Sequence, residues 1–442
     1  MARILLISND VIGPKMAGPG IRYTALAREL GRDHAVALAA PDPSTSPDDE
    51  LRVITYQTNR PKTLLPYLNK ADVVIAQSLH PSLLKRVRQR DIRYIADLYD
   101  PIVLENLEAQ REVPLANQQV QHDFQMATMT AQLAAADHIL CASDRQRDYW
   151  LGCLTSLGRL TPEVYRTDPS LDSLISLLPF GYENAAPVLT DPKAVAEVIP
   201  RFNVKKDKLI LWGGGIWNWF DPLSLIKAVE VLSRKRNDIK LLFLGTKHPN
   251  PQMPEMKMLT AAHELAEELK LLDTHVFFRE GWLPYDQLPN FLLPTAVGVS
   301  THFRHAETRF SFRTRILSYI GARRPILATK GDSMSDLIEQ TGIGLTVDYE
   351  DVPGIVRALT TLVDDKTFLK QVERSYDDLW PLFTWSNLIK PLSERITADD
   401  FVNQKMSWLD VSKLKWRYLI SGGKKVWRQK GGKAVARKLL GR

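Results

Sequence analysis

The segment KLILWGGG at residues 208–215 joins an apolar run to three consecutive glycines. The run at 208–212 predicts a buried strand. Glycine weakens a strand, so three glycines at its end indicate a place where the backbone approaches another group closely. Pro222 then opens a helical segment at 222–232, because proline suits the first helical turn. Strand, glycine loop and helix follow one another here.

The same alternation of apolar runs and helical segments extends through both halves of the chain. The runs in the first half are at 4–7, 35–39, 73–76, 94–96 and 138–141. Those in the second half are at 208–212, 239–244, 275–278, 296–300, 325–328 and 344–347. This alternation predicts parallel sheets covered by helices. We expect an α/β fold with two doubly wound, Rossmann-like domains facing one another across a cleft.

A linker rich in proline and glycine at 178–187 separates the two series of strands. We therefore expect a first domain at 1–183 and a second at 184–375. Open α/β sheets bind ligands outside the carboxyl ends of their strands. The functional site should accordingly be built from loops at strand ends.

The charge of the chain is distributed unevenly. The 442 residues carry 58 Lys and Arg against 51 Asp and Glu, a net charge of +7, and 44% are hydrophobic, which excludes disordered and collagen-like proteins. Eleven of the basic residues lie at 413–442, where there is no acid, so the preceding part has a net charge of −4. A DNA-binding protein usually spreads its positive charge over a folded face. We therefore expect no nucleic-acid partner.

The basic tail at 401–442 interleaves aromatic and aliphatic residues with lysine and arginine. This composition is typical of a helix lying at a membrane interface, where anionic lipids attract basic side chains. The residues expected to contact the membrane are Trp416, Lys424, Lys425, Trp427 and Arg428. A solvated or partner-bound tail is the alternative, and RNA binding is a weaker one.

No targeting or membrane-spanning segment is expected from the sequence. The apolar run at 4–7 is too short for a signal peptide, and no run approaches about 18 apolar residues. The two cysteines, Cys141 and Cys153, form neither a disulfide framework nor a metal motif. We expect a cytoplasmic protein, peripheral at the inner face of the plasma membrane.

Two loops have the composition of an anion site. Gly18-Pro19-Gly20 lies just before a helix, whose N-terminal amides favour a phosphate. A tight turn explains these glycines equally well. In the segment 300–325, Arg313 and Arg315 lie near a helix start with Arg309 before them. Cations there are unfavourable unless an anion binds, so a diphosphate is expected, with a solvated basic turn as the alternative.

Taken together, the motifs resemble those of GT-B glycosyltransferases, specifically family four, whose members are mostly retaining. The matching segments are 18–20, 136–143, 178–181, 243–245, 281–285, 307–325 and 383–388. Their order and spacing carry the resemblance, which extends from residue 1 to about 400. It implies that helices at about 376–400 cross back to complete the first domain.

The resemblance implies transfer of a sugar from a nucleotide diphosphate sugar, without a cofactor or metal. The second domain would hold the donor and the first domain the acceptor. The residues then expected at the diphosphate are Gly18, Gly20, Gly214, Gly215, Arg313 and Arg315. Trp282 and Ser318 are expected at the nucleoside.

The chain departs from the family pattern at several positions. Phe310 and Ser318 occupy the places of two family glutamates, so Glu307 is expected to take over the sugar contact. The family's basic pair after the first strand of the second domain is missing from 213–221. We expect Arg313 and Arg315 to substitute for it.

In the first domain, Asp97 and Asp100 follow a predicted strand and are expected at the acceptor. If the reaction inverts stereochemistry, Asp100 could be the general base. If it retains, Asp100 would only orient the acceptor, and capping a helix after Pro101 is the alternative role. His302, His305 and Glu307 form a weak metal motif, because no further ligand accompanies them.

The function expected is transfer of a sugar, with retention, to a lipid-linked or glycan acceptor in surface polysaccharide or glycolipid assembly. Residues 407–442 would hold the enzyme on an anionic membrane. A catalytically silent nucleotide-binding scaffold is one alternative. A nucleotide-sugar epimerase or a phosphorylase of the same fold is the other.

Overall fold

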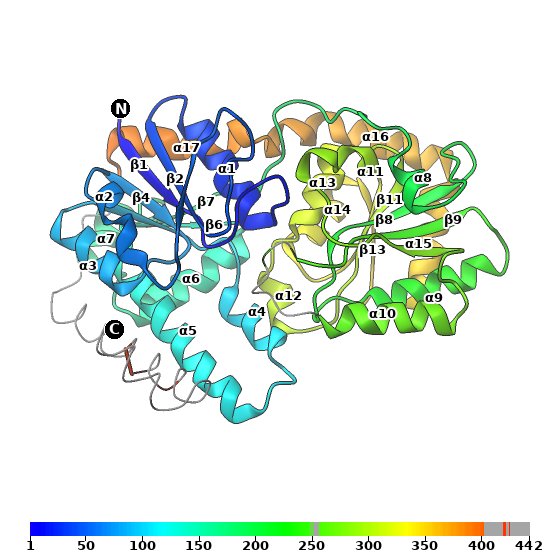
Figure 1. Ribbon diagram of the computed structural model, residues 1–442, viewed down its shortest axis with the longest axis horizontal. Helices are drawn as coiled ribbons and strands as arrows, with labels where there is room; N and C mark the ends of the chain where they lie inside the picture. The colour runs from blue at the N-terminus through cyan, green and yellow to red at the C-terminus, as the bar shows by residue number, and fades with distance from the viewer. Residues whose placement is uncertain (249, 251–255, 402–418, 421–423, 425–442) are drawn as a thin grey trace. The chain divides into compact units, whose positions relative to one another are not determined.

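The computed structural model describes residues 1–248, 250, 256–401, 419, 420 and 424. The chain divides into two compact units, each of which is described separately. The first unit comprises residues 1–10, 23–179 and the chain from 389 onward, and the second comprises 11–22 and 180–388. Each unit contains one parallel sheet with helices packed around it, so the predicted α/β class with two Rossmann-like domains is confirmed (Figure 1).

The first unit has a seven-stranded sheet in the order β3-β2-β1-β4-β5-β6-β7. Its strands are β1 Arg3–Ile7, β2 Ala35–Pro41, β3 Val53–Tyr56, β4 Val73–Ala76, β5 Arg93–Asp97, β6 His138–Cys141 and β7 Ile175–Leu177. All neighbouring strands are parallel. The central strands β4 and β6 are buried along their whole length, which explains their continuous apolar sequences.

The second unit has a six-stranded parallel sheet in the order β10-β9-β8-β11-β12-β13. Its strands are β8 Lys208–Gly215, β9 Ile239–Gly245, β10 Val276–Phe278, β11 Thr295–Ser300, β12 Ile326–Thr329 and β13 Gly344–Val347. The strand order reverses between β8 and β11. In open α/β sheets such a reversal marks the carboxyl edge at which ligands bind.

Helices cover both sheets. Those before residue 180 are α1 Gly18–Leu30, η1 Pro61–Leu64, α2 Leu65–Leu68, α3 Pro81–Gln89, α4 Ile102–Ala109, α5 Leu115–Ala135, α6 Asp144–Ser156 and α7 Pro162–Thr167. Those after it are α8 Ala194–Val198, α9 Pro222–Ser233, α10 Lys257–Glu268, η2 Tyr285–Gln287, α11 Pro289–Leu292, α12 Ala306–Phe310, α13 Thr314–Gly321, α14 Ser333–Thr341, α15 Val352–Asp364, α16 Lys366–Leu379, η3 Trp380–Phe383 and α17 Trp385–Ala398.

Helix starts follow from local chemistry. Before α9, the Asp221 carboxylate accepts a hydrogen bond from the amide of Ser224 at 2.9 Å, and Pro222 lies in the first turn. Asp332 and Ser335 form a reciprocal capping box at the start of α14. Each of these caps satisfies amides that have no partner within the helix.

The chain passes from the first unit to the second at 179/180 and returns at 388/389, whereas the sequence predicts boundaries at 183/184 and 375/376. Helix α16 belongs to the second unit, where the Tyr376 hydroxyl donates to the Arg324 carbonyl at 2.5 Å. Only from Ile389, inside α17, does the chain belong to the first unit. There the Ser393 hydroxyl lies 3.1 Å from the His34 ring and donates to Asp33 at 2.8 Å.

Within the described part of the chain, no helix is both long and apolar enough to cross a bilayer. The predicted membrane segment 401–442 lies outside that part, apart from Phe401, Leu419, Ile420 and Lys424. The contacts expected of Trp416, Lys425, Trp427 and Arg428 therefore stay predictions.

Candidate functional site

The glycine end of β8 lies beside the end of β9 in the second unit. Gly214 has a φ of +149°, a backbone conformation that residues with a Cβ atom rarely adopt. A Cβ on Gly245 would lie 2.7 Å from the Gly214 carbonyl carbon, so the two strand ends approach each other closely. The Gly213 amide donates to the Tyr319 hydroxyl at 2.8 Å. Close packing of the backbone thus accounts for part of the glycine signal.

Arg315, in the first turn of α13, lies against this glycine end. Its guanidinium carbon is 4.3 Å from the ring centroids of both Trp212 and Phe220, and Nη2 donates to the Gly215 carbonyl at 2.7 Å. Burial lowers the pKa of Arg315 to about 10, so the side chain remains charged at neutral pH.

The other terminal nitrogen of Arg315 is the unusual feature. Nη1 is buried and has no hydrogen-bond partner among the residues that the structure describes. A buried donor left unsatisfied costs about 1–3 kcal/mol. An anionic oxygen reaching Nη1 would remove this cost, so Arg315 keeps the capacity expected of a diphosphate ligand.

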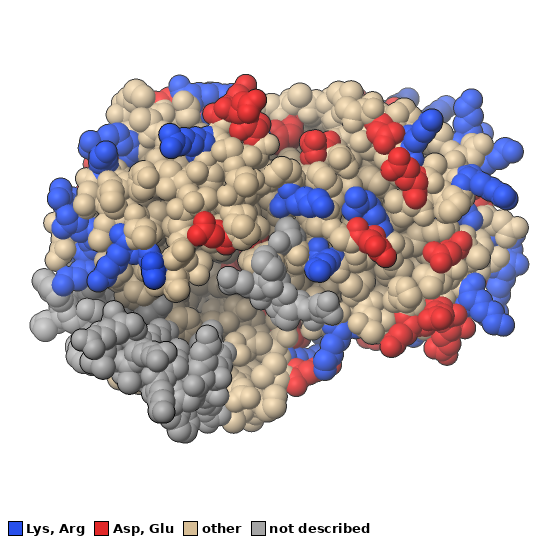
Figure 2. All heavy atoms as spheres, viewed as in Figure 1, with Lys and Arg blue, Asp and Glu red and all other residues tan. Residues whose placement is uncertain are grey.

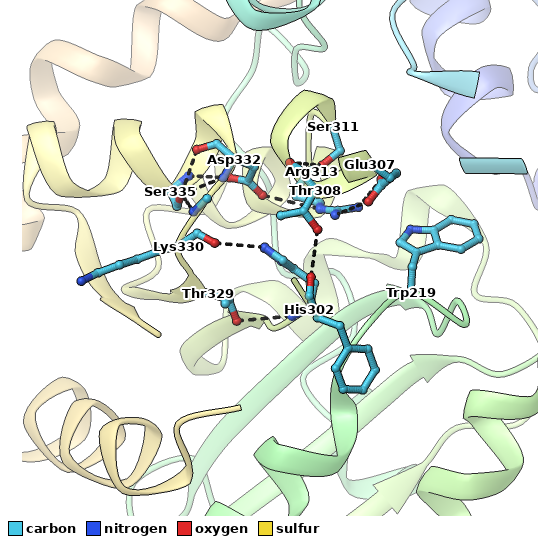
Figure 3. A network of polar contacts seen from close by, with 12 residues as sticks. Trp219, His302, Glu307, Thr308, Ser311, Arg313, Thr329, Lys330, Asp332 and Ser335 are labelled. Carbon is cyan, nitrogen blue, oxygen red and sulfur yellow. Dashed lines mark hydrogen bonds and ion pairs between the residues drawn. The ribbon is translucent and has the colours of Figure 1, made fainter. Parts of the chain in front are cut away.

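Arg313 and Glu307 are engaged with each other instead. Nη1 and Nη2 of Arg313 donate to Oε1 and Oε2 of Glu307 at 2.9 and 2.8 Å (Figure 3). Side-chain exposure is 5% for Arg313 and 0% for Glu307. The carboxylate expected to contact the sugar and a guanidinium expected to contact the diphosphate therefore form a buried, forked ion pair.

Asp332 adds a second carboxylate on the other side of Arg313. Its Oδ2 lies 3.5 Å from Arg313 Nε, while Oδ1 caps α14 by accepting from the Ser335 amide at 2.7 Å (Figure 3). Burial raises the pKa of Asp332 to about 6, and the Arg313 charge partly opposes this shift. The Arg313 guanidinium also lies 5.0 Å from the centroid of the Phe220 ring.

The two histidines of this segment are held by backbone groups. His302 Nε2 lies 3.3 Å from the Lys330 carbonyl, and burial keeps the pKa of this imidazole well below its ordinary value. His305 Nε2 lies 3.1 Å from the Trp219 carbonyl, and His305 Nδ1 accepts from the Thr308 amide at 3.2 Å. Both ring nitrogens of His305 are thus occupied by hydrogen bonds, which does not suit a metal ligand. Across the described ranges, no group of three His, Cys, Asp or Glu residues is arranged to hold a metal.

Four aromatic rings lie at the carboxyl ends of β8, β9 and β10. Trp217 and Trp219 stack with an interplanar angle of 7° and a centroid distance of 5.4 Å. His248 lies 5.6 Å from Trp217 and 5.3 Å from Trp282. Of these rings, the sequence interpretation had assigned only Trp282 to ligand binding. The usable signal was two tryptophans, two residues apart, directly after a glycine strand end.

The two residues expected at the nucleoside lie on different elements. The Trp282 ring is half-buried, and its Nε1 donates to the Met16 carbonyl at 3.1 Å. Ser318 lies in the middle of α13 and is half-buried. Their contacts with a nucleoside stay predictions.

Gly18 and Gly20 lie in the first turn of α1 rather than before it, and packing explains the second of them. A Cβ on Gly20 would lie 2.7 Å from the Val11 carbonyl oxygen and 2.8 Å from the Met16 Cβ. At Gly18 the nearest atom would be in the Phe180 ring, at an ordinary 3.6 Å. Close packing therefore suffices to explain Gly20, whereas Gly18 leaves room for a ligand role.

The carboxylates expected at the acceptor belong to the first unit. Asp97 is the last residue of β5 and is fully buried. Asp100 is half-buried, and the N-cap of the following helix α4 is Pro101, without a side-chain cap. Of the two carboxylates, Asp100 is the one that a solvent-borne hydroxyl can reach.

Comparison with known proteins identifies the fold. No family model and no curated protein sequence matches the chain. Among solved structures, sucrose-phosphate synthase from Thermosynechococcus elongatus is 16% identical with a TM-score of 0.62, and the alignment covers 90% of this chain and 100% of that one. HepE of Anabaena in complex with UDP-glucose is 11% identical with a TM-score of 0.63 and the same coverages. A glycosyltransferase from Rickettsia africae is 14% identical with a TM-score of 0.59, covering 90% of this chain and 98% of that one. The chain has the GT-B fold.

Proposed function

We propose that this protein is a glycosyltransferase that moves a sugar from a nucleotide diphosphate sugar to a lipid-linked or glycan acceptor. The observation that carries the proposal is the buried, unsatisfied Nη1 of Arg315 beside the glycine end of β8. It lies at the carboxyl ends of strands next to the reversal of strand order, where α/β sheets bind ligands. Charge-assisted hydrogen bonds from arginine to phosphate are among the strongest that proteins make.

A uridine diphosphate sugar is the first donor to test. HepE of Anabaena, which shares the fold, is described in complex with UDP and glucose. In this chain, the backbone of Gly214 and Gly215, the start of α13 and Arg315 Nη1 would together receive the diphosphate. These groups can neutralise a leaving diphosphate without a metal, as the proposal assumes.

The acceptor side of the proposal depends on the basic tail. A segment of eleven basic residues without an acid suits an anionic membrane, where a lipid-linked acceptor would lie. We accordingly propose a cytoplasmic enzyme, peripheral at the inner membrane face, working in surface polysaccharide or glycolipid assembly with retention. Asp100 would orient the acceptor hydroxyl.

A catalytically silent scaffold that binds nucleotide is the second candidate. It is favoured by one observation, the forked pair of Glu307 and Arg313, which leaves both groups buried and mutually neutralised. A scaffold would use Arg315 to bind the nucleotide and would need neither Glu307 nor Asp100 for chemistry.

Thermal-shift measurements with UDP-, GDP-, dTDP- and CMP-sugars test the first step. Stabilisation by one nucleotide class is expected, because a ligand that binds only the folded state raises the melting temperature. Release of nucleotide on adding acceptor lipid would then support the enzyme. Stabilisation without release would favour the scaffold, and no stabilisation by any donor would count against both.

A further inference from the structure

Basic side chains gather on one face of the first unit, over η1, α2 and α3. This basic face consists of Arg60, Lys62, Lys70, Lys85, Arg86, Arg88 and Arg90. Figure 2 shows the Lys and Arg atoms of this region at the left edge of the molecule, where α2 and α3 lie in Figure 1. Residues 57–93 contain just two acids, Asp72 and Asp91. Asp72 is paired with Arg3, whose Nε donates to it at 3.1 Å.

The elements of the basic face form one continuous surface. Arg86 Nε on α3 donates to Asn69 Oδ1, just after α2, at 2.6 Å. Lys70 and Arg90 precede the starts of β4 and β5, which pair at Val73 and Arg93. The basic residues of two connections in the chain therefore lie side by side.

The region of the basic face also contains an exposed aromatic side chain. Arg60, Lys62, Lys70 and Arg90 are exposed. Tyr67 is on α2, between Lys62 and Lys70 in the sequence, and is 41% exposed. Tyrosine is favoured at membrane interfaces because its ring is apolar and its hydroxyl is polar.

Helix stabilisation explains part of this surface. Arg86 and Arg88 lie in the last turn of α3, where cations interact favourably with the helix dipole. Arg60 is the N-cap of η1, where that argument does not apply, whereas Lys62 lies in the last turn of this four-residue element. The positive charge is thus larger than local helix stability requires.

We propose that the basic face binds the surface of an anionic lipid bilayer, as a second attachment site on the folded body in addition to the tail. The exposed Tyr67 favours lipid over nucleic acid, because one isolated ring gives no stacking platform for successive bases. The connections that carry Lys70 and Arg90 end at the amino edge of the sheet, whereas ligands bind at the carboxyl edge. Attachment here leaves the carboxyl edge open. The inference rests on charge and exposure, not on the proposed transferase activity.

The test compares two charge reversals in the full chain. The first variant is Lys62→Glu, Lys70→Glu, Arg90→Glu, on the basic face. The matched control is Lys205→Glu, Lys206→Glu, Lys235→Glu, which reverses three exposed lysines of the second unit. Partition onto vesicles of phosphatidylcholine with phosphatidylglycerol is measured, and melting temperatures establish that both variants are folded.

The basic-face variant is expected to bind anionic vesicles roughly tenfold or more weakly than the unmodified protein, since each basic residue near such a surface adds several-fold to the affinity. The control should stay within about twofold. A Lys62→Gln, Lys70→Gln, Arg90→Gln variant should give an intermediate loss. Equal binding by the reversal and the control overturns the proposal, whether or not both are weakened. A reversal variant that keeps vesicle binding but loses binding to a single-stranded RNA oligonucleotide also overturns the proposal.

Discussion

Among the described residues, Arg315 is the side chain that most directly indicates an anionic ligand. The buried Arg159 donates from Nη1 and Nη2 to the carbonyls of Leu133, Ala134 and Ala136, although its Nε has no hydrogen-bond partner among the described residues. In Arg315, Nη2 donates to the Gly215 carbonyl, and the terminal nitrogen Nη1 is the one that stays buried without a hydrogen-bond partner among the described residues. Because Trp212 and Phe220 both pack against its guanidinium, its position does not depend on a ligand. The residue is therefore preorganised for an anion.

Replacing Arg315 by methionine should weaken binding of a UDP-sugar tenfold or more, because a charge-assisted contact to phosphate is lost. The melting temperature of the unliganded protein should change little, since methionine keeps the apolar contacts with Trp212 and Phe220. Titration calorimetry checks the affinity. Arg309→Met, on an exposed arginine of α12, is the matched control and should bind like the unmodified protein. Unchanged affinity in Arg315→Met would contradict the assignment.

The pair of Glu307 and Arg313 predicts a large stability effect. Glu307→Ala should lower the free energy of unfolding by about 3 kcal/mol or more, because it leaves a buried guanidinium with only the more distant Asp332. The double variant Glu307→Ala, Arg313→Met should recover at least about 1 kcal/mol of that loss, since the uncompensated charge is gone. Denaturant unfolding measures both values. A loss below about 1 kcal/mol in the single variant would show that the pair contributes little.

Sequence reasoning located this region but not the pairing within it. Glu307, Arg313 and Arg315 were each singled out from residue type and from their place before a helix. Which of them would be paired inside the protein depends on side-chain directions at the junction of α12 and α13, and a helix break at Ser311 sets these directions. No periodicity in the sequence records that break. The stacked Trp217 and Trp219 were missed because aromatic residues are more often core than site.

At the scale of elements, the start of α14 should respond to pH. The pKa of Asp332 is raised to about 6 in the folded protein, whereas an unfolded aspartate has a pKa of about 3.9. Between pH 4 and 6 the folded state therefore binds more protons than the unfolded state. Its stability falls as the pH rises through this window, by about 2–3 kcal/mol from this group.

The Asp332→Asn variant should lack this dependence, because asparagine does not ionise but can still accept the hydrogen bond from the Ser335 amide. The quantity to measure is the difference in unfolding free energy between the unmodified protein and Asp332→Asn, at several pH values from 4 to 7. We expect the unmodified protein to lose stability relative to the variant as the pH rises. A constant difference across this range would mean that Asp332 titrates normally.

Most elements of the two sheets could be predicted, and the misses have a common cause. Strands buried on both faces, such as β4 and β6, have continuous apolar sequences and were found. The strands β3 and β7 were missed. Each is an edge strand of its sheet and is only partly buried, so its sequence alternates or stays short. The return to the first unit, predicted near residue 376, begins at Ile389 inside α17, because the sequence of an amphipathic helix such as α16 does not say which unit it packs against.

Over the whole molecule, the distribution of charge matters more than its sum. The net charge of +7 combines a part with net −4 and a tail with eleven bases and no acid. Within the first part, bases concentrate again on η1, α2 and α3. If both basic regions bind lipid, the protein attaches through two sites on one chain, and the second contact is strengthened by the effective concentration that the first provides.

Deleting residues 405–442 tests the larger of the two sites. The truncated protein should bind anionic vesicles at least tenfold more weakly at about 0.15 M salt, because the tail contributes most of the positive charge and surface charges are screened beyond about 8 Å. Residual binding through the basic face should be more sensitive to salt than binding of the full chain, which adds apolar contacts from Trp416 and Trp427. The melting temperature and the affinity for UDP-sugars should be unchanged, since the site lies in the second unit. Vesicle binding within about twofold of the full chain would mean that the tail is not a membrane anchor. A loss of affinity for UDP-sugars would mean that the tail contributes to donor binding.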